Sequence, residues 1–373
     1  GKTVLGLRVA EAMAARGELR SAMVLVPSID LVSQTLREWR RWGDNTEDWH
    51  ALVVCSSTSE QNVSRTTDPA EIASFLAGGG RRVVFCTYHS AERVAAAQQS
   101  PFDLLICDEA HVTAGRGTQR DARPLDDEFL AAERRLFLTA TPRLYAKRRA
   151  SSDKDDAELL ASMDDESLYG RVVYRLNHAD AVNEGVVAPL KLVLLNATES
   201  FERLVNENAV LRRELAGRAI STDTKLALAI FDCQQRFGAT TVFSFHAKNE
   251  RARLFSEVAQ SVLGAAASAF GAPGWSVDRV DGRMKAGDRR DVLSAVSSER
   301  PTLITNARVL TTGVDVPAVD LVAFADPKQS HLDILQAMAR AARVSEGKDF
   351  GYVFVPIGEN EEQGPYDTAV EVM

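Results

Sequence analysis

The part of the chain that most constrains its fold is residues 102–111, which read Phe-Asp-Leu-Leu-Ile-Cys-Asp-Glu-Ala-His. The apolar run Leu104–Cys107 predicts a strand that is buried on both faces, as in a parallel sheet covered by helices. Asp108 and Glu109 follow at the carboxyl end of that strand, where open α/β sheets bind ligands. Two adjacent acids suit phosphoryl transfer, because one can hold Mg²⁺ while the other orients and deprotonates an attacking water.

The same pair of acids has a simpler explanation, since carboxylates are also favoured at the start of a helix. Asp108 and Glu109 would then only cap the helix that follows. The local sequence leaves both interpretations open, and other parts of the chain are needed to decide between them.

The size and composition of the chain limit its class. Its 373 residues exceed one ordinary core, so two domains are expected, and 45% hydrophobic with 26% charged residues is typical of a soluble globular protein. No apolar run approaches the roughly 18 to 20 residues that span a bilayer, and no basic and then apolar leader opens the chain, so no membrane partner is expected. Four widely spaced cysteines predict free core thiols in a reducing cytoplasm, without a metal or disulfide framework.

The net charge of −8 means that the chain has no overall basic field. A nucleic-acid partner is still compatible with this charge. A motor can hold phosphates with backbone amides, hydroxyls and a few local Arg or Lys residues.

The chain opens with Gly1, Lys2 and Thr3, and an amphipathic helix is expected over about Val4–Arg16. These three residues match the end of the phosphate-binding loop Gly-x-x-x-x-Gly-Lys-[Ser/Thr]. In that loop backbone N–H groups hold the phosphates, the Lys neutralises their charge and the hydroxyl helps to hold Mg²⁺. The first half of the loop and the strand before it are not in the chain, so we expect a fragment that begins inside its own nucleotide site and binds nucleotide poorly without the upstream residues.

Polar side chains follow other predicted strands. Pro27 and Ser28 follow the strand Ala22–Val26 and precede a helix expected over about Ile29–Trp42, and Thr87 ends a later strand. Hydroxyls at helix N-termini suit nucleic-acid phosphates, so we predict these three residues as nucleic-acid contacts. An ordinary strand-to-helix cap explains Ser28 about as well.

Thr139 and Thr141 follow a strand expected at Arg134–Leu138. Their hydroxyls, at a neighbouring strand end, are predicted to hydrogen-bond the acids of residues 108–111. Such bonds would couple the nucleotide site to movement elsewhere in the protein.

Four motifs occur in order on successive strands: Gly-Lys-Thr, Val-Leu-Val-Pro-Ser, Asp-Glu-Ala-His and Thr-Ala-Thr-Pro. Together they resemble the first RecA-like domain of superfamily 2 helicases and translocases of the DEAD/DEAH-box type. The resemblance implies ATP and Mg²⁺ as cofactors and Glu109 as the catalytic base. It also implies that Gly1, Lys2, Thr3, Asp108 and His111 bind the nucleotide, with Thr3 and Asp108 holding the metal.

The second half resembles the matching helicase domain. Thr241–Phe245 resembles motif IV; Ser244 is predicted to contact nucleic acid, and His246 is either a contact to nucleotide or nucleic acid or purely structural. Residues 306–317 resemble motif V. In the family, Thr311 and Thr312 would touch the nucleic-acid backbone, while Gly313 and Asp315 would face the nucleotide.

Gln336, Arg340 and Arg343 fit the pattern Gln-x-x-x-Arg-x-x-Arg and share one face of a helix expected over residues 331–343. Family members usually have Gly where Ala339 stands. The resemblance implies that these three residues complete the catalytic set, because guanidinium groups can stabilise charge on the γ-phosphate. The alternative is a pair of surface arginines.

For other segments the sequence predicts secondary structure and domain limits but no functional residues. We expect a mobile, charged excursion around residues 143–166, a strand over Leu168–Leu176 and a hinge at residues 181–190 between domains 1–180 and 191–373. The helical stretch Phe201–Ala219 either faces DNA or a partner, or packs on its own domain, which we favour.

The sequence therefore predicts an α/β fold of two tandem RecA-like P-loop domains, each a parallel sheet flanked by helices. The expected function is an ATP-dependent helicase or translocase on nucleic acid, with DNA preferred to RNA, in which hydrolysis opens and closes a cleft between the domains. The wording of the motifs is closest to restriction-type DNA motors and to actinobacterial helicases with helicase-associated repeats, so further domains or subunits are expected outside the fragment. A nucleic-acid-binding or assembly module without turnover is the alternative, and a regulatory P-loop switch is disfavoured.

Overall fold

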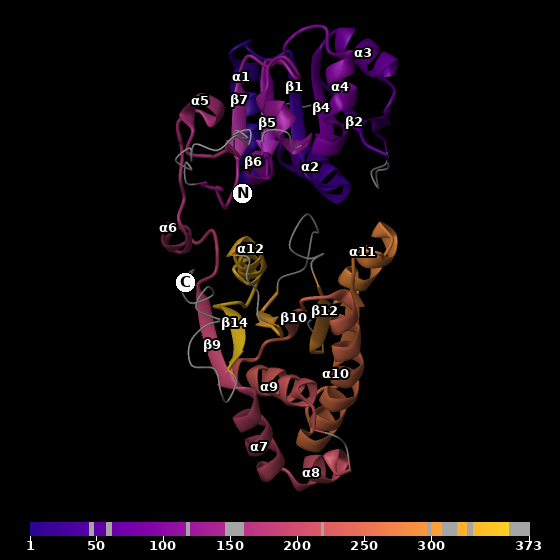
Figure 1. The fold of residues 1–373 in the computed structure, drawn as a ribbon, viewed down its shortest axis with the longest axis vertical. Helices are drawn as coiled ribbons and strands as arrows, with labels where there is room; N and C mark the ends of the chain where they lie inside the picture. The colour runs from indigo at the N-terminus through magenta and orange to yellow at the C-terminus, as the bar shows by residue number, and fades with distance from the viewer. Residues whose placement is uncertain are drawn as a thin grey trace, which may run out of the picture. The chain divides into compact units, whose positions relative to one another are not determined.

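The computed structural model describes residues 1–44, 48–56, 62–116, 120–145, 160–217, 220–296, 300–307, 319–326 and 331–357. The chain divides into two compact units, Gly1–Tyr174 and Arg175–Met373. Each unit contains, within these residues, a six-stranded sheet with helices packed on it (Figure 1). All strand pairs of both sheets are parallel, which confirms the predicted α/β class.

The first sheet has the strand order β3-β2-β4-β1-β5-β7. Its central strands are buried along nearly their whole length, because helices cover both faces, and this burial explains their continuous apolar sequences. The strands are β1 (Ser21–Val26), β2 (Trp49–Val54), β3 (Ser64–Arg65), β4 (Arg81–Thr87), β5 (Leu104–Asp108) and β7 (Arg135–Leu138). The helices and 3₁₀ turns are α1 (Lys2–Ala15), α2 (Ile29–Trp42), α3 (Pro69–Ala77), η1 (Tyr88–Ser90), α4 (Ala91–Ala97), η2 (Ala110–Thr113) and η3 (Arg120–Leu125).

Alternate residues of each strand serve the two faces of this sheet. Val24 of β1 packs with the buried residues of α1 and α2. Its neighbour Met23 packs on the other face, with buried residues of α3 and α4. The period of two in strand side chains therefore divides one apolar run between two cores.

Helix α1 packs closely against β5 and β7 at Gly6. A Cβ atom on Gly6 would meet a methyl carbon of Ile106 in β5 at 3.4 Å and one of Leu138 in β7 at 3.5 Å. These are ordinary van der Waals distances, so a methyl group would already fill the space at residue 6. The first turn of α1, which carries Lys2, is held near the acids that follow β5.

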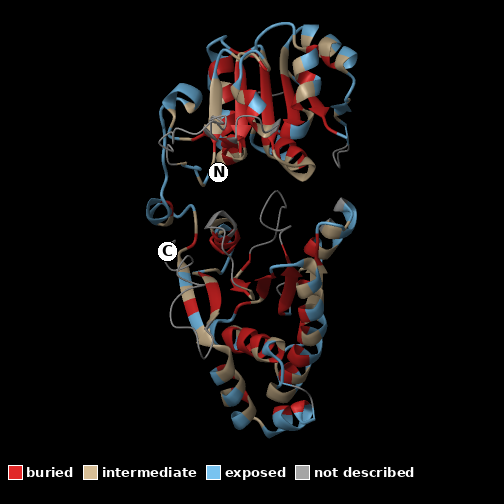
Figure 2. Ribbon diagram, in the orientation of Figure 1, coloured by how far each residue is buried: buried red, intermediate tan, exposed pale blue. Residues whose placement is uncertain are grey.

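The second sheet has the strand order β11-β12-β10-β13-β14-β9. Helices α7, α9 and α10 contribute to a core on one face, and α11 and α12 to a core on the other, so that the central strands are buried (Figure 2). The strands are β9 (Leu190–Asn196), β10 (Thr241–Phe245), β11 (Ser276–Val280), β12 (Thr302–Asn306), β13 (Leu321–Phe324) and β14 (Gly351–Ile357). The helices are α6 (His178–Asn183), α7 (Ala197–Glu207), α8 (Ala209–Leu215), α9 (Thr222–Phe237), α10 (Asn249–Phe270), α11 (Ala286–Ser294) and α12 (His331–Ala341).

In both sheets an aspartate just before one central strand binds backbone N–H groups at the start of the neighbouring strand. Asp103, just before β5, accepts hydrogen bonds from the N–H groups of Arg20 and Ser21 at the start of β1, at 2.7 and 2.8 Å. Asp320, just before β13, accepts from two successive N–H groups at the start of β10, at 2.9 and 3.0 Å. Charge-assisted bonds to backbone N–H groups are strong, so each aspartate ties neighbouring parallel strands in register.

The prediction of a strand over Leu168–Leu176 is wrong. The segment begins in a short helix, α5 (Glu166–Tyr169), which ends at Gly170 with a φ of 68°. The residues after Gly170 form no strand, and Val173 is 74% exposed. Apolar residues in succession favour an extended chain, but a strand also needs a neighbour to pair with, and the sequence does not show whether one is in reach.

The predicted helical stretch Phe201–Ala219 consists of two helices, α7 and α8, separated at Asn208. The Asn208 side chain accepts hydrogen bonds from N–H groups in the first turn of α8, so it caps the second helix. Leu204, Leu211 and Leu215 are buried in the core that α9 and α10 also line. This stretch therefore packs on its own unit, as the favoured interpretation stated.

The division into units falls between Tyr174 and Arg175. The predicted hinge, residues 181–190, contains the end of α6 and reaches the first residue of β9. Near its end, the N–H of Ala188 donates to the carbonyl of Ala342, at 2.8 Å, within the second unit. The domain limits 180 and 191 and the hinge itself stay predictions.

Three smaller expectations concern composition and the charged excursion. The four cysteines, Cys55, Cys86, Cys107 and Cys233, are free and buried, as predicted. None of the helices described is both long and apolar enough to cross a membrane. Much of the predicted excursion, residues 146–159, lies outside the described residues, and after it β8 (Leu160–Ala161) pairs with β6 (Gly115–Arg116).

Candidate nucleotide site

The site is built at the carboxyl end of β5, where the chain leaves the sheet. Asp108, the last residue of the strand, is only 5% exposed. Its Oδ1 accepts the backbone N–H of Glu109 at 2.9 Å, and its carbonyl accepts the hydroxyl of Tyr88 at 2.9 Å. Burial raises the pKa of the Asp108 carboxyl, and the charge of Lys2 acts against that rise.

Glu109 adopts a left-handed backbone conformation, with φ 49° and ψ 44°. Residues with a side chain rarely adopt it, and the strain costs on the order of 1–3 kcal/mol, which is commonly found at functional sites. The Glu109 side chain makes no capping hydrogen bond to the 3₁₀ turn η2 that follows. The simple helix-cap explanation therefore does not account for Glu109.

The Glu109 carboxylate lies between two cationic or hydrogen-bonding partners. Its Oε1 is 2.6 Å from Nζ of Lys2, and its Oε2 is 3.3 Å from Nδ1 of His111. Burial would raise the pKa of Glu109, but the hydrogen bond to His111 and the charge of Lys2 outweigh it and lower the pKa to about 2. Glu109 is therefore ionised at neutral pH, as a base must be.

His111 connects this carboxylate to the next strand end. It is 2% exposed, and its Nδ1 is 3.2 Å from Oγ1 of Thr139, which follows β7. Oγ1 of Thr139 also accepts the N–H of Thr141, while the buried hydroxyl of Thr141 has no hydrogen-bond partner in the described part of the chain. The predicted bonds from Thr139 and Thr141 to the acids are not seen; Thr139 reaches His111 instead, so any coupling through Thr139 would pass through the histidine.

Thr3 and Asp108 are the two residues predicted to hold Mg²⁺. Thr3 lies half-buried in the first turn of α1. Gly1, at the N-cap of this helix, has no side chain with which to cap it. Mg²⁺ is commonly held by one or two protein oxygens, with substrate phosphates and water completing an octahedron. No cluster of three or more His, Cys, Asp or Glu side chains in the described residues could hold a metal ion without such help. Thr3 and Asp108 fit the ion only as part of a nucleotide complex.

The ion pairs of Glu109 predict a pH dependence of stability. Because its pKa in the folded chain is lowered from 4.5 to about 2, ionised Glu109 stabilises the fold above pH 4.5, and this contribution is lost as the pH falls toward 2. On acidification, wild type should lose up to about 3 kcal/mol of unfolding free energy beyond the loss of Glu109→Gln. Urea titrations followed by tryptophan fluorescence test this, since Trp39, Trp42 and Trp49 all lie in the first unit. Equal losses in both proteins would contradict it.

The hydroxyls that follow β1 and β4 act as caps. Oγ of Ser28 accepts the N–H of Leu31 at the start of α2, at 3.3 Å, and Oγ1 of Thr87 accepts the N–H of Ser90 at 3.2 Å. Pro27 and Ser28 are half-buried, and Thr87 is 5% exposed. The capping interpretation of Ser28 is confirmed. The nucleic-acid role of these three residues stays a prediction.

In the second unit, Ser244 and His246 have no exposed surface. Oγ of Ser244 is 3.1 Å from Nε2 of His246, and the histidine ring lies 4.9 Å from the ring of Phe255. Both side chains lie in the core of the second unit in this conformation. The nucleic-acid contact predicted for Ser244 stays a prediction. The motif V residues Thr311, Thr312, Gly313 and Asp315 lie outside the described residues.

The three residues of the arginine pattern do not share one helix. Helix α12 ends at Ala341, so Arg343 lies past its end, with its N–H bonded to the carbonyl of Arg340 at 3.3 Å. Arg340 is 7% exposed, whereas Gln336 and Arg343 are half-buried. Arg343 is therefore the more exposed residue of the pair.

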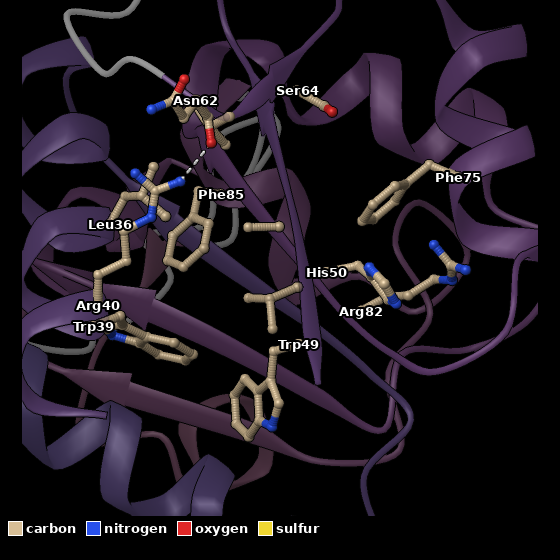
Figure 3. A pocket seen from close by; sticks show the side chains of 13 residues that line it. Leu36, Trp39, Arg40, Trp49, His50, Asn62, Ser64, Phe75, Arg82 and Phe85 are labelled. Carbon is tan, nitrogen blue, oxygen red and sulfur yellow. Dashed lines mark hydrogen bonds between the residues drawn. The ribbon is translucent and has the colours of Figure 1, made fainter. Parts of the chain in front are cut away.

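A cavity of about 470 Å³ in the first unit was not foreseen from the sequence (Figure 3). Its strand residues come from β2, β3 and β4, and none comes from β5, whose carboxyl end carries Asp108. Trp39, Trp49 and Phe85 contribute aromatic rings, and Arg40 donates to the carbonyl of Asn62 at its rim, at 2.9 Å. None of the predicted site residues lines it.

Comparison with known proteins agrees with this geometry. Residues 1–144 match the family model "Type III restriction enzyme, res subunit", and residues 230–345 match "Helicase conserved C-terminal domain". A probable helicase of African swine fever virus is 26% identical over 351 residues, covering 91% of this chain and 36% of the viral protein. The chain thus spans about a third of that relative.

Two solved structures share the fold over the whole chain. The ATP-dependent Type ISP restriction-modification enzyme LlaBIII bound to DNA matches with a TM-score of 0.76 and 27% identity, and this chain covers 27% of it. A nuclease-deletion mutant of the Type ISP enzyme LlaGI, with a DNA substrate mimic, matches with a TM-score of 0.64 and 24% identity, covering 26% of that chain. The two parallel sheets are those of tandem RecA-like domains. The chain belongs to the superfamily 2 helicases, with a ResIII domain in its first unit and a helicase C-terminal domain in its second.

Proposed function

We propose that this chain is the motor of an ATP-dependent DNA helicase or translocase. The observation that carries the proposal is the ionised Glu109 carboxylate, held by Lys2 and His111 beside the buried Asp108 at the end of β5. An ionised base next to a magnesium-type aspartate at a strand end is what water activation for phosphoryl transfer requires. The match to an ATP-dependent restriction enzyme bound to DNA supports ATP as fuel and DNA as substrate.

The roles of the first-unit residues follow from their contacts. Lys2 and the N–H groups at the start of α1 would bind phosphate oxygens, and Thr3 with Asp108 would hold Mg²⁺, which supplies charge neutralisation. Lys2 cannot fully serve both a phosphate and Glu109. Binding of phosphate to Lys2 would therefore weaken its pull on Glu109 and raise the basicity of that carboxylate, as a general base needs.

The remaining roles are proposed from the family resemblance. Gln336, Arg340 and Arg343 would complete the catalytic set, and Gly313 and Asp315 would help to bind ATP. Thr311 and Thr312, with Pro27, Ser28 and Thr87, would contact the DNA backbone. Thr139 would couple the site through His111, with Thr141 bonded to it. A cytoplasmic location is proposed from the four free thiols alone.

Hydrolysis of ATP is the measurement that tests the proposal. It is followed with single-stranded DNA, duplex DNA, RNA and no nucleic acid, on this chain and on a version extended upstream through a complete phosphate-binding loop. We expect DNA to stimulate hydrolysis by the extended version, and more than RNA does. RNA stimulation equal to or above that by DNA would overturn the DNA assignment. DNA binding without turnover in either version would show a passive nucleic-acid-binding module.

A further inference from the structure

The end of the arginine-bearing helix α12 is held by a lysine that no motif includes. Nζ of Lys348 lies 2.6 Å from the carbonyl oxygen of Ala341, the last residue of α12. The same nitrogen lies 2.6 Å from the carbonyl oxygen of Val319, just before β13. One ammonium group thus joins the end of α12 to the segment that enters β13, a strand inside the sheet.

The electrostatics suit this arrangement. The last carbonyl groups of a helix have no partner within it and carry partial negative charge, so a cation there is stabilising. Burial lowers the pKa of Lys348, while the charge of Asp320 acts in the opposite direction. An ammonium group is costly to place in such a partly buried site unless it donates hydrogen bonds to acceptors, as it does here to the carbonyl oxygens of Ala341 and Val319.

Gly351 packs closely against the same carbonyl group of Ala341. A Cβ atom on Gly351, the first residue of β14, would lie 2.0 Å from the carbonyl oxygen of Ala341 and 2.8 Å from Cδ2 of Leu190. Real Cβ atoms essentially never come so close to a backbone oxygen. Only glycine therefore allows β14 to start this near to the end of α12.

The chain that enters β9 is fastened to the same turn. The N–H of Ala188 donates to the carbonyl of Ala342 at 2.8 Å, and the N–H of Gly351 donates to the carbonyl of Pro189 at 2.9 Å. Ala342 lies between Arg340 and Arg343 in the sequence. Two segments, residues 188–189 and 348–351, thus pack against the turn that carries the two arginines; Ala188 and Lys348 bond to it directly, and Gly351 bonds to Pro189.

We propose that Lys348 is a positioning residue for Arg343, acting by fixing the carbonyl end of α12. The inference rests on the proposed role of Arg343 in ATP hydrolysis, and it adds a residue and a physical link that the helicase motifs do not contain. Removing the ammonium group would free the Ala341 carbonyl and loosen the turn through Arg343. Displacements of about 1 Å at a catalytic group can lower turnover up to about a hundredfold.

Hydrogen exchange tests whether Lys348 holds the end of α12, a contact that we call the clamp, and it does so without requiring turnover. Backbone amides of residues 341–343 should exchange about 5- to 10-fold faster in Lys348→Met than in wild type, because one hydrogen bond to the turn is lost. Lys348 and Lys191 both line a cavity of about 680 Å³ in the second unit. Lys191→Met is the matched control, because Nζ of Lys191 lies over the ring of Phe350, 3.4 Å from its centroid. Unchanged exchange in Lys348→Met, or equal acceleration in Lys191→Met, would overturn the proposal.

Kinetics test the link to the arginine. Lys348→Met should lower kcat about tenfold with KM for ATP within about twofold of wild type, and Lys348→Arg should restore part of the loss. In an Arg343→Ala background the lysine substitution should cost nothing further, because both act through one group. A full additional loss there would overturn the proposal. If kcat falls in Arg343→Ala but not in Lys348→Met, the role of Lys348 is refuted while the proposed role of Arg343 stands. If kcat does not fall in Arg343→Ala, the proposed role of Arg343 is refuted, and the catalytic role of Lys348 with it.

Discussion

Glu109→Gln is expected to lower kcat for ATP by about 10²- to 10⁴-fold while leaving the affinity for ATP nearly unchanged. The amide keeps the size of the side chain but cannot accept a proton from water. The carboxylate is ionised at neutral pH, and Lys2 and His111 lower its pKa further, to about 2, so the proposed base carries the charge that its role requires. The substitution removes the negative charge that both partners face.

Single-turnover hydrolysis and equilibrium binding of a fluorescent ATP analogue separate the two quantities. Glu71→Gln is a suitable control, because it makes the same chemical change on the exposed surface of α3. Circular dichroism of both variants should match that of wild type. Turnover within threefold or so of wild type in Glu109→Gln would reject Glu109 as the base, since a positioned base supplies at least about a hundredfold.

Arg343→Ala is expected to reduce the DNA-stimulated kcat by about 10³-fold, the lower end of the effect of an arginine that stabilises phosphoryl-transfer charge. Arg343 is the better candidate for this role because it is half-buried, while Arg340 is 7% exposed within the second unit. Arg343→Lys should recover little activity, since an ammonium group cannot reproduce the planar fork of a guanidinium.

The measurement is kcat and KM for ATP at saturating DNA, with DNA binding followed separately by fluorescence anisotropy. Arg253→Ala serves as the control, because Arg253 pairs with Glu250 and Glu257 on the surface of α10. Loss of DNA affinity with kcat preserved would move Arg343 from catalysis to nucleic-acid binding. An unchanged kcat with unchanged binding would remove it from the site.

Local patterns were sufficient for many elements. The limits of α2 agree with the sequence prediction, as does the position of Asp108 at the end of β5. In each case the signal is carried by the segment itself: a capping serine before an amphipathic helix, or an apolar run that must be buried on both faces. The exposed segment after α5 shows the limit of such signals, because an extended, apolar sequence became a strand only where a partner was available.

Contacts between segments were not predictable in the same way. The sequence predicted that Thr139 and Thr141 bond to the acids after β5. In the structure Thr139 lies beside His111 instead. The sequence also placed Ser244 at a strand end, yet its hydroxyl turned inward to His246. Side-chain direction at a strand end depends on packing from neighbouring elements, which no local pattern encodes.

The amino-acid sequence by itself determined the α/β class, the order of the motifs and the acids at the end of β5, because these depend on residue type and spacing along one segment. Only the tertiary structure decided which partners lower the pKa of Glu109 and which contacts hold the turn that carries Arg340 and Arg343. Both depend on atoms far apart in the chain: Lys2 lies 107 residues from Glu109, and Lys348 meets the carbonyl of Val319 from another part of the second unit. Electrostatic energies change steeply over a few ångströms, so they are set by the packing that brings such groups together.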